Sequence, residues 1–460
     1  MTTQTAQPQK TEFRLFRSIH ILTGETLYER PPQSQAEFQT ALSALRQRQR
    51  HFAAQPVTAR TALLSAFAQR LDAERGRLAR MVSEEVGRCL TECRAELDKS
   101  VELIRYYTRL APELLAHKTI ATQASLSQVR FEPLGVVLAV MPWNYPVWQV
   151  LRFAIPALCT GNACAVKPAP SVARVSNALF ELVGDVPLMP AWLEHADIPQ
   201  AIADTDALAF TGSADTGRIL AAEAGGRLKK TVLELGGSNA FIVLPDADLR
   251  QAAKDACYSR FRDAGQSCNA AKRIIVTEAV AEPFIRLFLD ECAKLQTGDP
   301  LDAQTTLASL HRADLRERVH AQVLDAAANG AQILCGGEIP AGQGWFYPAT
   351  VLDKVNPACR AYREEVFGPV AAILRARDAE HAVELANDNP YGLGASIYSA
   401  DEAAAWRYAE KLHTGAVYIN RHTSSDLRLP FGGVKASGYG RELSEFGLYE
   451  FVNIKTYWQK

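Results

Sequence analysis

The stretch Phe261-Arg262-Asp263-Ala264-Gly265-Gln266-Ser267-Cys268 presents a cysteine on a turn directly after a predicted helix. The helix is expected over 249–262, and Gly265 loosens the chain behind it. A thiol in this place can meet a bound molecule, and the backbone N–H of Cys268 can face the same molecule. An isolated cysteine is more often a small buried hydrophobe, which is how we interpret the other cysteines of the chain.

Two polar residues upstream supply what such a thiol needs. Glu234 lies in Leu-Glu-Leu-Gly-Gly at 233–237, and Asn144 lies between two prolines in Pro-Trp-Asn-Tyr-Pro at 142–146. Taken alone, the first is more often a solvated carboxylate and the second a turn asparagine. Together with Cys268 they are a general base, an amide donor for an oxyanion and a soft nucleophile. Covalent oxidation of an aldehyde requires these three groups.

Short apolar strands alternate with helix-like segments on both sides of Glu234. The expected strands are 136–140, 163–166, 207–210, 240–244, 273–276, 370–374, 396–399 and 417–419, and the expected helices are 148–158, 171–183, 249–262 and 280–293. Strands that alternate with helices indicate parallel sheets covered by helices. The sequence therefore predicts the α/β class, with a domain change near Glu234.

The flanking segments have other patterns. Residues 35–115 carry apolar i, i+3/i+4 spacing and predict helices. Residues 118–131 are rich in Thr, Ser and β-branched side chains and predict extended hairpin strands. The apolar stretch 448–458 predicts a further strand, which needs a partner edge such as that of a neighbouring subunit.

Length and charge exclude several classes of protein. A chain of 460 residues predicts two or three lobes, and a net charge of −1 gives no long-range field for nucleic acid or an anionic membrane. The nine cysteines show no CxxC or Cys/His spacing, so we expect neither disulfides nor a metal site. The first 15 residues lack the apolar core of a signal peptide, and prolines interrupt the uncharged run 133–148. We expect a soluble cytoplasmic protein.

The three motifs stand in the order in which they occur in the aldehyde dehydrogenase superfamily, which the chain resembles from about Ile21 to its C-terminus. The resemblance implies a Rossmann-type nucleotide-binding domain (1–115 plus 132–233) and an α/β catalytic domain (234–429). It also implies a small β oligomerisation arm (116–131 plus 430–460) that joins copies of the chain into homodimers or homotetramers.

The resemblance assigns a role to each catalytic residue. Cys268 attacks the aldehyde, and the resulting oxyanion is held by the side-chain amide of Asn144 and the N–H of Cys268. Hydride then passes to a nicotinamide and leaves a thioester. Glu234 activates the water that releases the acid.

The same resemblance implies NAD or NADP as the cofactor. The segment Phe-Thr-Gly-Ser-Ala-Asp-Thr-Gly at 210–217 follows a strand and opens a helix whose N-terminus can bind a pyrophosphate. By resemblance Lys167 contacts the adenosine ribose, while Glu365 and Phe367 hold the nicotinamide ribose and ring. The expected cofactor-binding residues are Trp143, Lys167, Pro170, Gly212, Ser213, Gly217, Leu235, Glu365 and Phe367.

The chain departs from the NAD-preferring members at one position. Those members resemble Lys-Pro-Ser-Glu here, whereas residues 167–170 read Lys-Pro-Ala-Pro. A glutamate would accept the ribose 2′-OH and repel a 2′-phosphate. Pro170 removes both effects, so we expect NADP to be tolerated.

Four residues indicate what the far end of the substrate carries. Arg152, Arg262, Ser425 and Phe431 fall on positions that resemble the substrate-binding set of succinate-semialdehyde dehydrogenases, above all the short bacterial form. An isolated arginine is usually solvated, but two arginines beside a thiol in an otherwise apolar channel would be costly without an anion. The resemblance therefore implies oxidation of succinate semialdehyde to succinate.

Three alternatives stay open. The substrate can be a related semialdehyde or a broad range of aliphatic aldehydes. A cofactor-independent thiol esterase would use Cys268 and Asn144 but leave Lys167, Glu365 and Phe367 without a role. A non-catalytic cofactor-binding protein is disfavoured because no catalytic residue is missing.

Overall fold

Strand β5 (Val136–Val140) lies inside a six-stranded sheet in the computed structural model, which describes residues 15–460. Its side chains alternate between two apolar cores, because successive residues of a strand point to opposite faces. Val136 and Leu138 pack in one core, and Val137 and Ala139 pack in the other. A strand that is apolar on both faces is typical of a parallel sheet with helices on each side.

This sheet, which lies within the expected nucleotide-binding domain and is called the nucleotide-binding sheet below, has the strand order of a Rossmann fold. Its strands in spatial order are β19 (Gly438–Tyr439), β9 (Lys230–Glu234), β8 (Ala207–Thr211), β5, β6 (Ala163–Lys167) and β7 (Leu188–Pro190). All neighbours are parallel except β19 and β9. Counted along the chain, β5 to β9 follow the order 3-2-1-4-5, and ligands of such sheets bind at the carboxyl ends beside the point where the order reverses.

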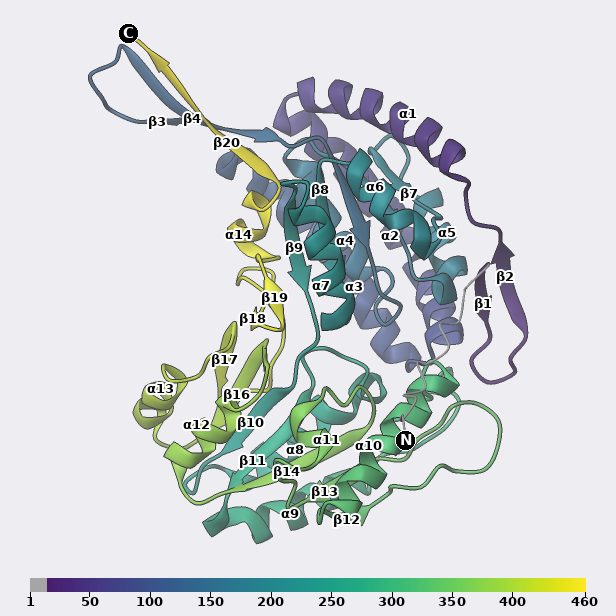
Figure 1. The fold of residues 1–460 in the computed structure, drawn as a ribbon, viewed down its shortest axis with the longest axis vertical. Helices are drawn as coiled ribbons and strands as arrows, with labels where there is room; N and C mark the ends of the chain where they lie inside the picture. The colour runs from purple at the N-terminus through teal and green to yellow at the C-terminus, as the bar shows by residue number, and fades with distance from the viewer. Residues whose placement is uncertain (1–14) are drawn as a thin grey trace, which may run out of the picture.

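Helices cover both faces of this sheet (Figure 1). They are α1 (Gln35–Ala54), α2 (Val57–Val86), α3 (Leu90–Leu114), α4 (Trp148–Cys159), α5 (Ala173–Glu181), α6 (Ile198–Asp204) and α7 (Ala214–Gly225), with the short turns η1 (Pro170–Val172) and η2 (His195–Asp197). Ser34 and Glu37 form a capping box that starts α1. A hairpin of β1 (Phe16–Ile19) and β2 (Thr26–Arg30), which the sequence analysis did not predict, packs beside α5.

A second, seven-stranded sheet lies in the lower half of Figure 1, within the expected catalytic domain, and is called the catalytic sheet below. Its strands in spatial order are β12 (Gln332–Cys335), β13 (Thr350–Asp353), β14 (Val370–Ala376), β11 (Ala271–Thr277), β10 (Asn239–Val243), β16 (Gly394–Tyr398) and β17 (Ala416–Ile419). Its helices are α8 (Leu249–Phe261), η3 (Arg262–Gly265), α9 (Glu278–Cys292), α10 (Ala313–Ala328), α11 (Arg360–Arg363), α12 (Ala379–Asn387) and α13 (Glu402–Ala409). The predicted α/β class is confirmed in both domains.

The two sheets meet end to end. The chain leaves the carboxyl end of β9 at Glu234 and enters the amino end of β10 at Asn239 after only four residues. The carboxyl ends of β5, β6, β8 and β9 therefore face the region where the catalytic sheet begins. Residues at these strand ends, and those just before β11 and β14, are brought to one place.

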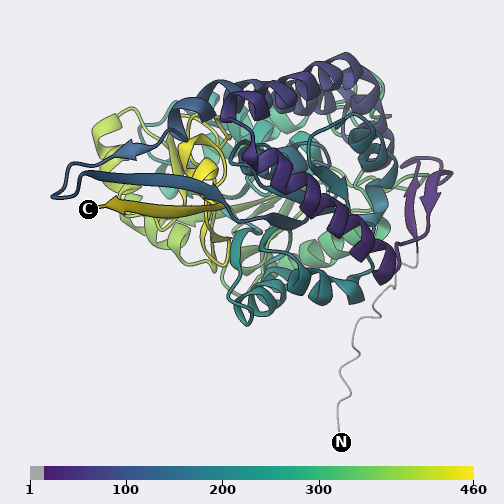
Figure 2. The same cartoon turned by 90° about the horizontal axis from the view of Figure 1, so that it is seen from above.

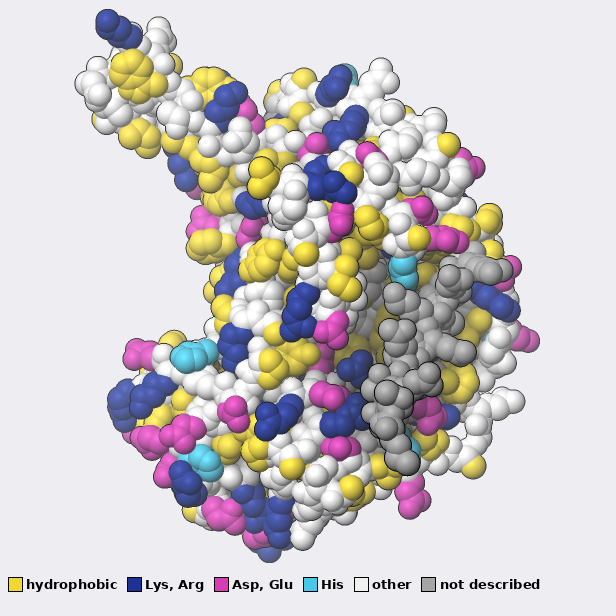
Figure 3. Space-filling model, in the orientation of Figure 1, with side chains coloured by type: hydrophobic (Ala, Val, Ile, Leu, Met, Phe, Trp, Pro, Cys, Tyr) yellow, Lys and Arg dark blue, Asp and Glu magenta, His cyan; other side chains and the backbone are white. Residues whose placement is uncertain are grey.

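The arm is a three-stranded sheet in the order β20-β4-β3. Strand β20 (Val452–Gln459) pairs antiparallel with β4 (Leu126–Pro133), and β4 pairs with β3 (Lys118–Thr119). The sheet projects from the body as a thin ribbon (Figures 1 and 2). Its surface carries exposed apolar side chains (Figure 3), among them Ile454 and Trp458.

The arm is smaller than the expected 116–131 plus 430–460. Strand β19 belongs to the nucleotide-binding sheet, and β18 (Val434–Lys435) pairs with β15 (Tyr391–Gly392). The expected strand over 448–458 also begins too early, because Ser444–Tyr449 form helix α14. Leu448 of that helix is fully buried in the core that contains α4, so this segment packs on the body instead of extending into the arm.

No helix among residues 15–460 is long and apolar enough to cross a membrane. The prediction that the N-terminus is not a signal peptide concerns residues that lie, except for the last of them, outside the described part of the chain.

Candidate active site

Two cavities meet at Cys268. One, of about 270 Å³, lies at the carboxyl ends of the nucleotide-binding sheet and reaches Glu234, Glu365 and Phe367. The other, of about 260 Å³, opens on the opposite side of the thiol and is bordered by helices α3 and α4 and the loop at 424–431. Cys268 and Gln149 are the only described residues that line both. The thiol thus stands between a cleft for one ligand and a pocket for another.

The turn expected before Cys268 is present, and it is tightly held. Asp263, Ala264 and Gly265 have φ values of +54°, +51° and +71°, a left-handed run that ends α8 abruptly. A side chain at Gly265 would place its Cβ 2.3 Å from the carbonyl oxygen of Gly368, so only glycine fits. Arg88 fixes the start of the run with a 2.6 Å hydrogen bond from Nε to Asp263 Oδ1.

The Cys268 thiol is protonated when the site is at rest. Burial raises its pKa to about 11, although Arg152 and Lys272 oppose that shift. Because η3 and the turn lead into β11, no helix begins at Cys268 to lower the pKa. Lys272 instead bonds the backbone, with Nζ 2.7 Å from the carbonyl oxygen of Cys268. The thiol must lose its proton before it attacks. Either a base accepts the proton, or ligand binding changes the surroundings of Cys268 so that the thiolate forms.

Asn144 is placed to complete an oxyanion site beside the turn. Its side chain is buried, and Nδ2 donates to the carbonyl oxygen of Gln266 at 3.1 Å. A side-chain amide carries two N–H donors, so one remains for a bound oxyanion. The side chain of Gln266 is fixed in turn by the N–H of His311, at 2.9 Å from Oε1.

Glu234 ends β9 as predicted and is buried with both carboxyl oxygens free of hydrogen bonds among the described residues. Burial raises the pKa of this carboxyl well above its ordinary value; Arg152 lowers it in part, and Glu442 raises it further. A buried polar group without a partner is uncommon and needs a reason. A carboxyl whose pKa is raised is a stronger base once it is ionised, which suits a general base that acts on a bound water.

The cofactor cleft is built on the ends of the parallel strands. Trp143 follows β5, and Gly212 and Ser213 follow β8, where Oγ of Ser213 caps α7 by accepting the Thr216 N–H at 3.3 Å. A Cβ at Gly217 would lie 2.5 Å from a methyl carbon of Leu235, so glycine lets α7 pack directly on the end of β9. The free N–H groups at the start of α7 then face the cleft and suit a pyrophosphate.

Lys167 and Pro170 lie beside this cavity and do not line it. Lys167 ends β6, and its ammonium is buried 5.6 Å from the centre of the Phe16 ring, with its pKa lowered by burial to about 8. A buried ammonium of this kind suits ribose or phosphate oxygens. Pro170 opens η1 and places no carboxylate there. The residues present therefore fit a dinucleotide, with or without a 2′-phosphate.

Glu365 and Phe367 precede β14 and line the cleft near Cys268. Glu365 Oε1 lies 2.9 Å from Lys272 Nζ and accepts the Gly237 N–H at 3.2 Å. Phe367 meets Trp143 edge to face, with ring centres 5.8 Å apart. Glu365 is thus already paired with a lysine, which the sequence analysis did not predict.

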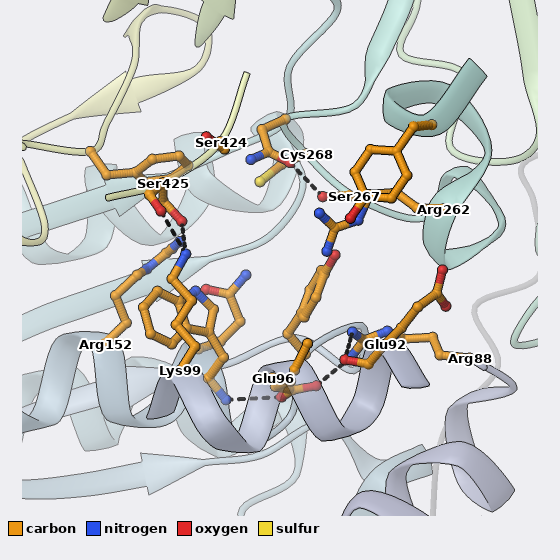
Figure 4. A pocket seen from close by; sticks show the side chains of 17 residues that line it. Arg88, Glu92, Glu96, Lys99, Arg152, Arg262, Ser267, Cys268, Ser424 and Ser425 are labelled. Atoms are coloured by element: carbon orange, nitrogen blue, oxygen red, sulfur yellow. Dashed lines mark hydrogen bonds and ion pairs between the residues drawn. The ribbon is translucent and has the colours of Figure 1, made fainter. Parts of the chain in front are cut away.

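The predicted substrate residues gather around the second cavity (Figure 4). Arg152 is buried, forms an ion pair with Glu442 and lies 4.8 Å above the centre of the Phe431 ring. Its Nη2 has no hydrogen-bond partner among the described residues. Arg262 is half-buried, with Nε 3.0 Å from Asp263 Oδ2. The free, buried Nη2 of Arg152 suits an incoming carboxylate.

The expectation of an otherwise apolar channel is wrong. Charged side chains from α3 and the segment before it also line the cavity; these are Arg88, Glu92, Glu96 and Lys99. The apolar i, i+3/i+4 spacing of residues 35–115 predicted helices here but did not predict charged side chains in a cavity. Lys272 lies within the largely apolar strand Ala271–Thr277, and a lysine in such a strand is a sequence signal for a buried functional cation. The sequence around Lys99 carries no comparable signal. Within residues 15–460, no three His, Cys, Asp or Glu side chains gather as ligands for a metal ion.

Comparison with known proteins gives consistent matches over almost the whole chain. Residues 8–457 match the sequence model of the Aldehyde dehydrogenase family. The chain is 42% identical to an NAD(P)+ succinate semialdehyde dehydrogenase of Escherichia coli (strain K12), over 96% of this chain and 97% of that protein. It is 39% identical to an NADP(+) succinate-semialdehyde dehydrogenase of Mycobacterium avium (strain 104), over 96% of both chains.

A solved structure shares the fold closely. The crystal structure of succinic semialdehyde dehydrogenase from Streptococcus pyogenes with NADP+ superposes with a TM-score of 0.93 at 34% identity. The match covers 96% of this chain and 99% of that one.

The raised pKa of Cys268 predicts how fast the free protein is alkylated. The rate with iodoacetamide should rise about tenfold for each pH unit from about pH 7 to about pH 10, because the thiolate is the reactive form and its pKa is about 11. The measurement is peptide mass spectrometry of the Cys268 peptide over time, with Cys268→Ser as the control. A rate that levels off between about pH 9 and about pH 10 would show an ordinary thiol with a pKa of about 8.5.

Proposed function

The chain belongs to the aldehyde dehydrogenase family, and from that premise we propose that it oxidises succinate semialdehyde to succinate with NADP+ or NAD+. The observation that carries the substrate assignment is the second cavity, where Arg152, Arg262 and Ser425 stand on the side of Cys268 away from the cofactor cleft. An aldehyde with a carboxylate at its other end can place one group at the thiol and the other among these donors.

The carboxylate would find donors that are already in place. Arg152 offers Nη2, which is buried without a partner among the described residues, and Arg262 borders the same space. Charge-assisted hydrogen bonds of this kind are stronger than neutral ones. Phe431, stacked under the Arg152 guanidinium, would cover the methylene groups between aldehyde and carboxylate.

The chemistry begins when the Cys268 thiol loses its proton to solvent water and Sγ forms a bond to the aldehyde carbon. The free N–H of the Asn144 side chain and the Cys268 backbone N–H stabilise the negative oxygen that results. NAD(P)+, when bound, accepts the hydride that leaves this carbon. The product on the protein is a thioester of Cys268.

Glu234 then acts on the water that cleaves the thioester. Its raised pKa makes it a stronger base than an exposed carboxylate once it is ionised. Water attack breaks the carbon–sulfur bond, releases the acid and returns the thiol. The strand ends that hold Glu234 and the turn that holds Cys268 keep both groups at the junction of the two cavities.

A thiol esterase is the weaker second candidate. It would need Cys268 and Asn144, but it would leave the cofactor cleft of about 270 Å³ without a ligand.

We also propose that the arm joins copies of this chain into dimers or tetramers in the cytoplasm. Ile454 and Trp458 on β20 are 63% and 54% exposed, and β20 lies at the edge of its sheet. Apolar side chains on an open strand edge favour pairing with another chain. All nine cysteines are free thiols, which suits a reducing compartment.

The substrate assignment is tested with a panel of C2–C6 aldehydes and semialdehydes, followed by cofactor reduction at 340 nm. We expect succinate semialdehyde to exceed butyraldehyde, which has the same chain length, in kcat/KM. Truncation of one partner of a guanidinium–carboxylate pair costs about 2–5 kcal/mol. Arg262→Ala should therefore lower kcat/KM for succinate semialdehyde by roughly 30-fold or more, and affect butyraldehyde far less.

Arg262 is the better test position. Arg152→Ala would leave the buried Glu442 carboxylate without its partner beside Glu234, and it would therefore lower the activity with both substrates. If both substrates fall in parallel in Arg262→Ala, the protein is a general aldehyde dehydrogenase.

The role of Glu234 predicts a kinetic signature. Glu234→Gln should give a single-turnover burst of reduced cofactor followed by slow steady-state turnover, because the thioester forms and then waits for water. Rapid-mixing absorbance at 340 nm measures both phases, and Cys268→Ser, which forms no thioester, should show no burst. Loss of the burst in Glu234→Gln with Cys268 alkylation intact would assign Glu234 to hydride transfer or thiol activation instead.

Pro170 predicts the cofactor preference. Pro170→Glu should restore an acceptor for the ribose 2′-OH and repel a 2′-phosphate, shifting the preference towards NAD+ by about 5- to 30-fold. Pro170→Ala, which adds no charge, is the matched control. An unchanged ratio of kcat/KM for NADP+ and NAD+ in Pro170→Glu would place the discrimination at another residue.

A further inference from the structure

The arginines around the substrate cavity are each paired with a carboxylate. Arg152 is paired with Glu442, and Arg262 is paired with Asp263. Arg88 is paired with Glu96 and, at 2.6 Å, with Asp263 as well. Each guanidinium therefore has a buried carboxylate of its own. Such arginines still donate hydrogen bonds, but much of their charge is already balanced.

Lys99 is the exception among the cations that line this cavity. Its Nζ donates to two neutral atoms of one residue, the hydroxyl oxygen of Ser425 at 2.5 Å and the carbonyl oxygen of Ser425 at 2.8 Å. The same ammonium lies 4.6 Å above the centre of the Trp148 ring. No ion pair joins Lys99 to a carboxylate within the described residues. The nearby Asp426 is held by Arg428, with Oδ2 2.7 Å from Nη2.

Lys99 has no carboxylate partner among the described residues, and Glu92, which lines the same cavity, has its pKa raised by burial to about 8. Burial, together with the charges of Arg152 and Arg262, lowers the pKa of Lys99 to about 8, and Asp426 opposes this only weakly. An ammonium has three N–H donors, and Ser425 takes two of them. One donor therefore remains, on a side chain that lines the cavity beside Arg152 and Ser425 (Figure 4).

We propose that Lys99 is a specificity-determining residue, which binds the distal carboxylate of the substrate through its ammonium and, with Ser425, selects anionic aldehydes over neutral ones. The inference rests on the proposed function and adds the cation whose charge the substrate balances. Ser425 acts twice: it holds the ammonium in one position, and its hydroxyl lies next to the place where the carboxylate would bind. Because the donor is held before the substrate arrives, little freedom is lost on binding.

The first test compares two substrates in Lys99→Met, which keeps the unbranched side chain and removes the charge. The ratio of kcat/KM for succinate semialdehyde to that for butyraldehyde should fall about 10- to 100-fold, the effect expected for one charged hydrogen bond. Arg105→Met is the matched control, because it removes a cation from the outer side of the same helix, where Arg105 pairs with Asp72. That control should leave the ratio as it is.

The second test needs neither cofactor nor turnover. Iodoacetate and iodoacetamide alkylate the same thiol and differ in one negative charge, so the ratio of their rates at Cys268 reports the charge of the cavity. Peptide mass spectrometry of the Cys268 peptide gives both rates. Lys99→Met should lower the iodoacetate-to-iodoacetamide ratio about tenfold, while Lys99→Arg, which keeps the charge, should retain most of it.

The outcomes separate this inference from the proposed function. If the wild-type protein prefers succinate semialdehyde but Lys99→Met changes neither ratio, Lys99 is structural and the inference is overturned while the proposed function stands. Equal loss with both substrates and both alkylating reagents would also overturn it. If the wild-type protein shows no preference for succinate semialdehyde and Lys99→Met still lowers the alkylation ratio, the cavity selects another anionic aldehyde and the proposed substrate is wrong.

Discussion

One buried guanidinium, that of Arg88, holds the active-site geometry together. It bonds Asp263 at the start of the left-handed turn, forms an ion pair with Glu96 of α3, and reaches the carbonyl oxygen of Asn144 at 3.3 Å. Glu96 in turn accepts the N–H groups of Val147 and Trp148 at the start of α4. The two parts of the oxyanion site are thus tied to one side chain. Loss of one partner of such a buried pair leaves an uncompensated charge and costs about 3–5 kcal/mol.

The end-to-end meeting of two sheets explains why one thiol can serve two ligands. The carboxyl ends of the nucleotide-binding strands supply the cofactor cleft, while helices α3 and α4 and the loop at 424–431 supply the substrate cavity. Cys268 arrives between them on a turn that belongs to neither sheet. Each ligand can therefore contact its own set of residues. The two sets meet around Cys268, where the reacting carbon of the substrate would lie.

The sequence predicted those parts of the site that local patterns encode. Glu234 at a strand end and Cys268 behind a helix were found because each sits within its own motif, and the alternating strands predicted both sheets. Lys99 was not predicted, because its partner Ser425 lies 326 residues away in the sequence. In an amphipathic helix, a lysine that faces a cavity cannot be distinguished by sequence from the lysines that face solvent. Glu442 as the partner of Arg152 was missed for the same reason. The arm was drawn too large because the pairing of β19 with β9 cannot be read from residues 430–443 alone.

The pairing of β19 with β9 also has a consequence during synthesis on the ribosome. Strands β5 to β9 emerge together, but Gly438 and Tyr439, which cover the outer edge of β9, are made about 200 residues later. At ordinary rates of translation that edge stays open for roughly 10–40 s. An uncovered apolar strand edge is a template for wrong pairing. The edge of β9 is therefore open to wrong pairing until its last neighbour has been translated.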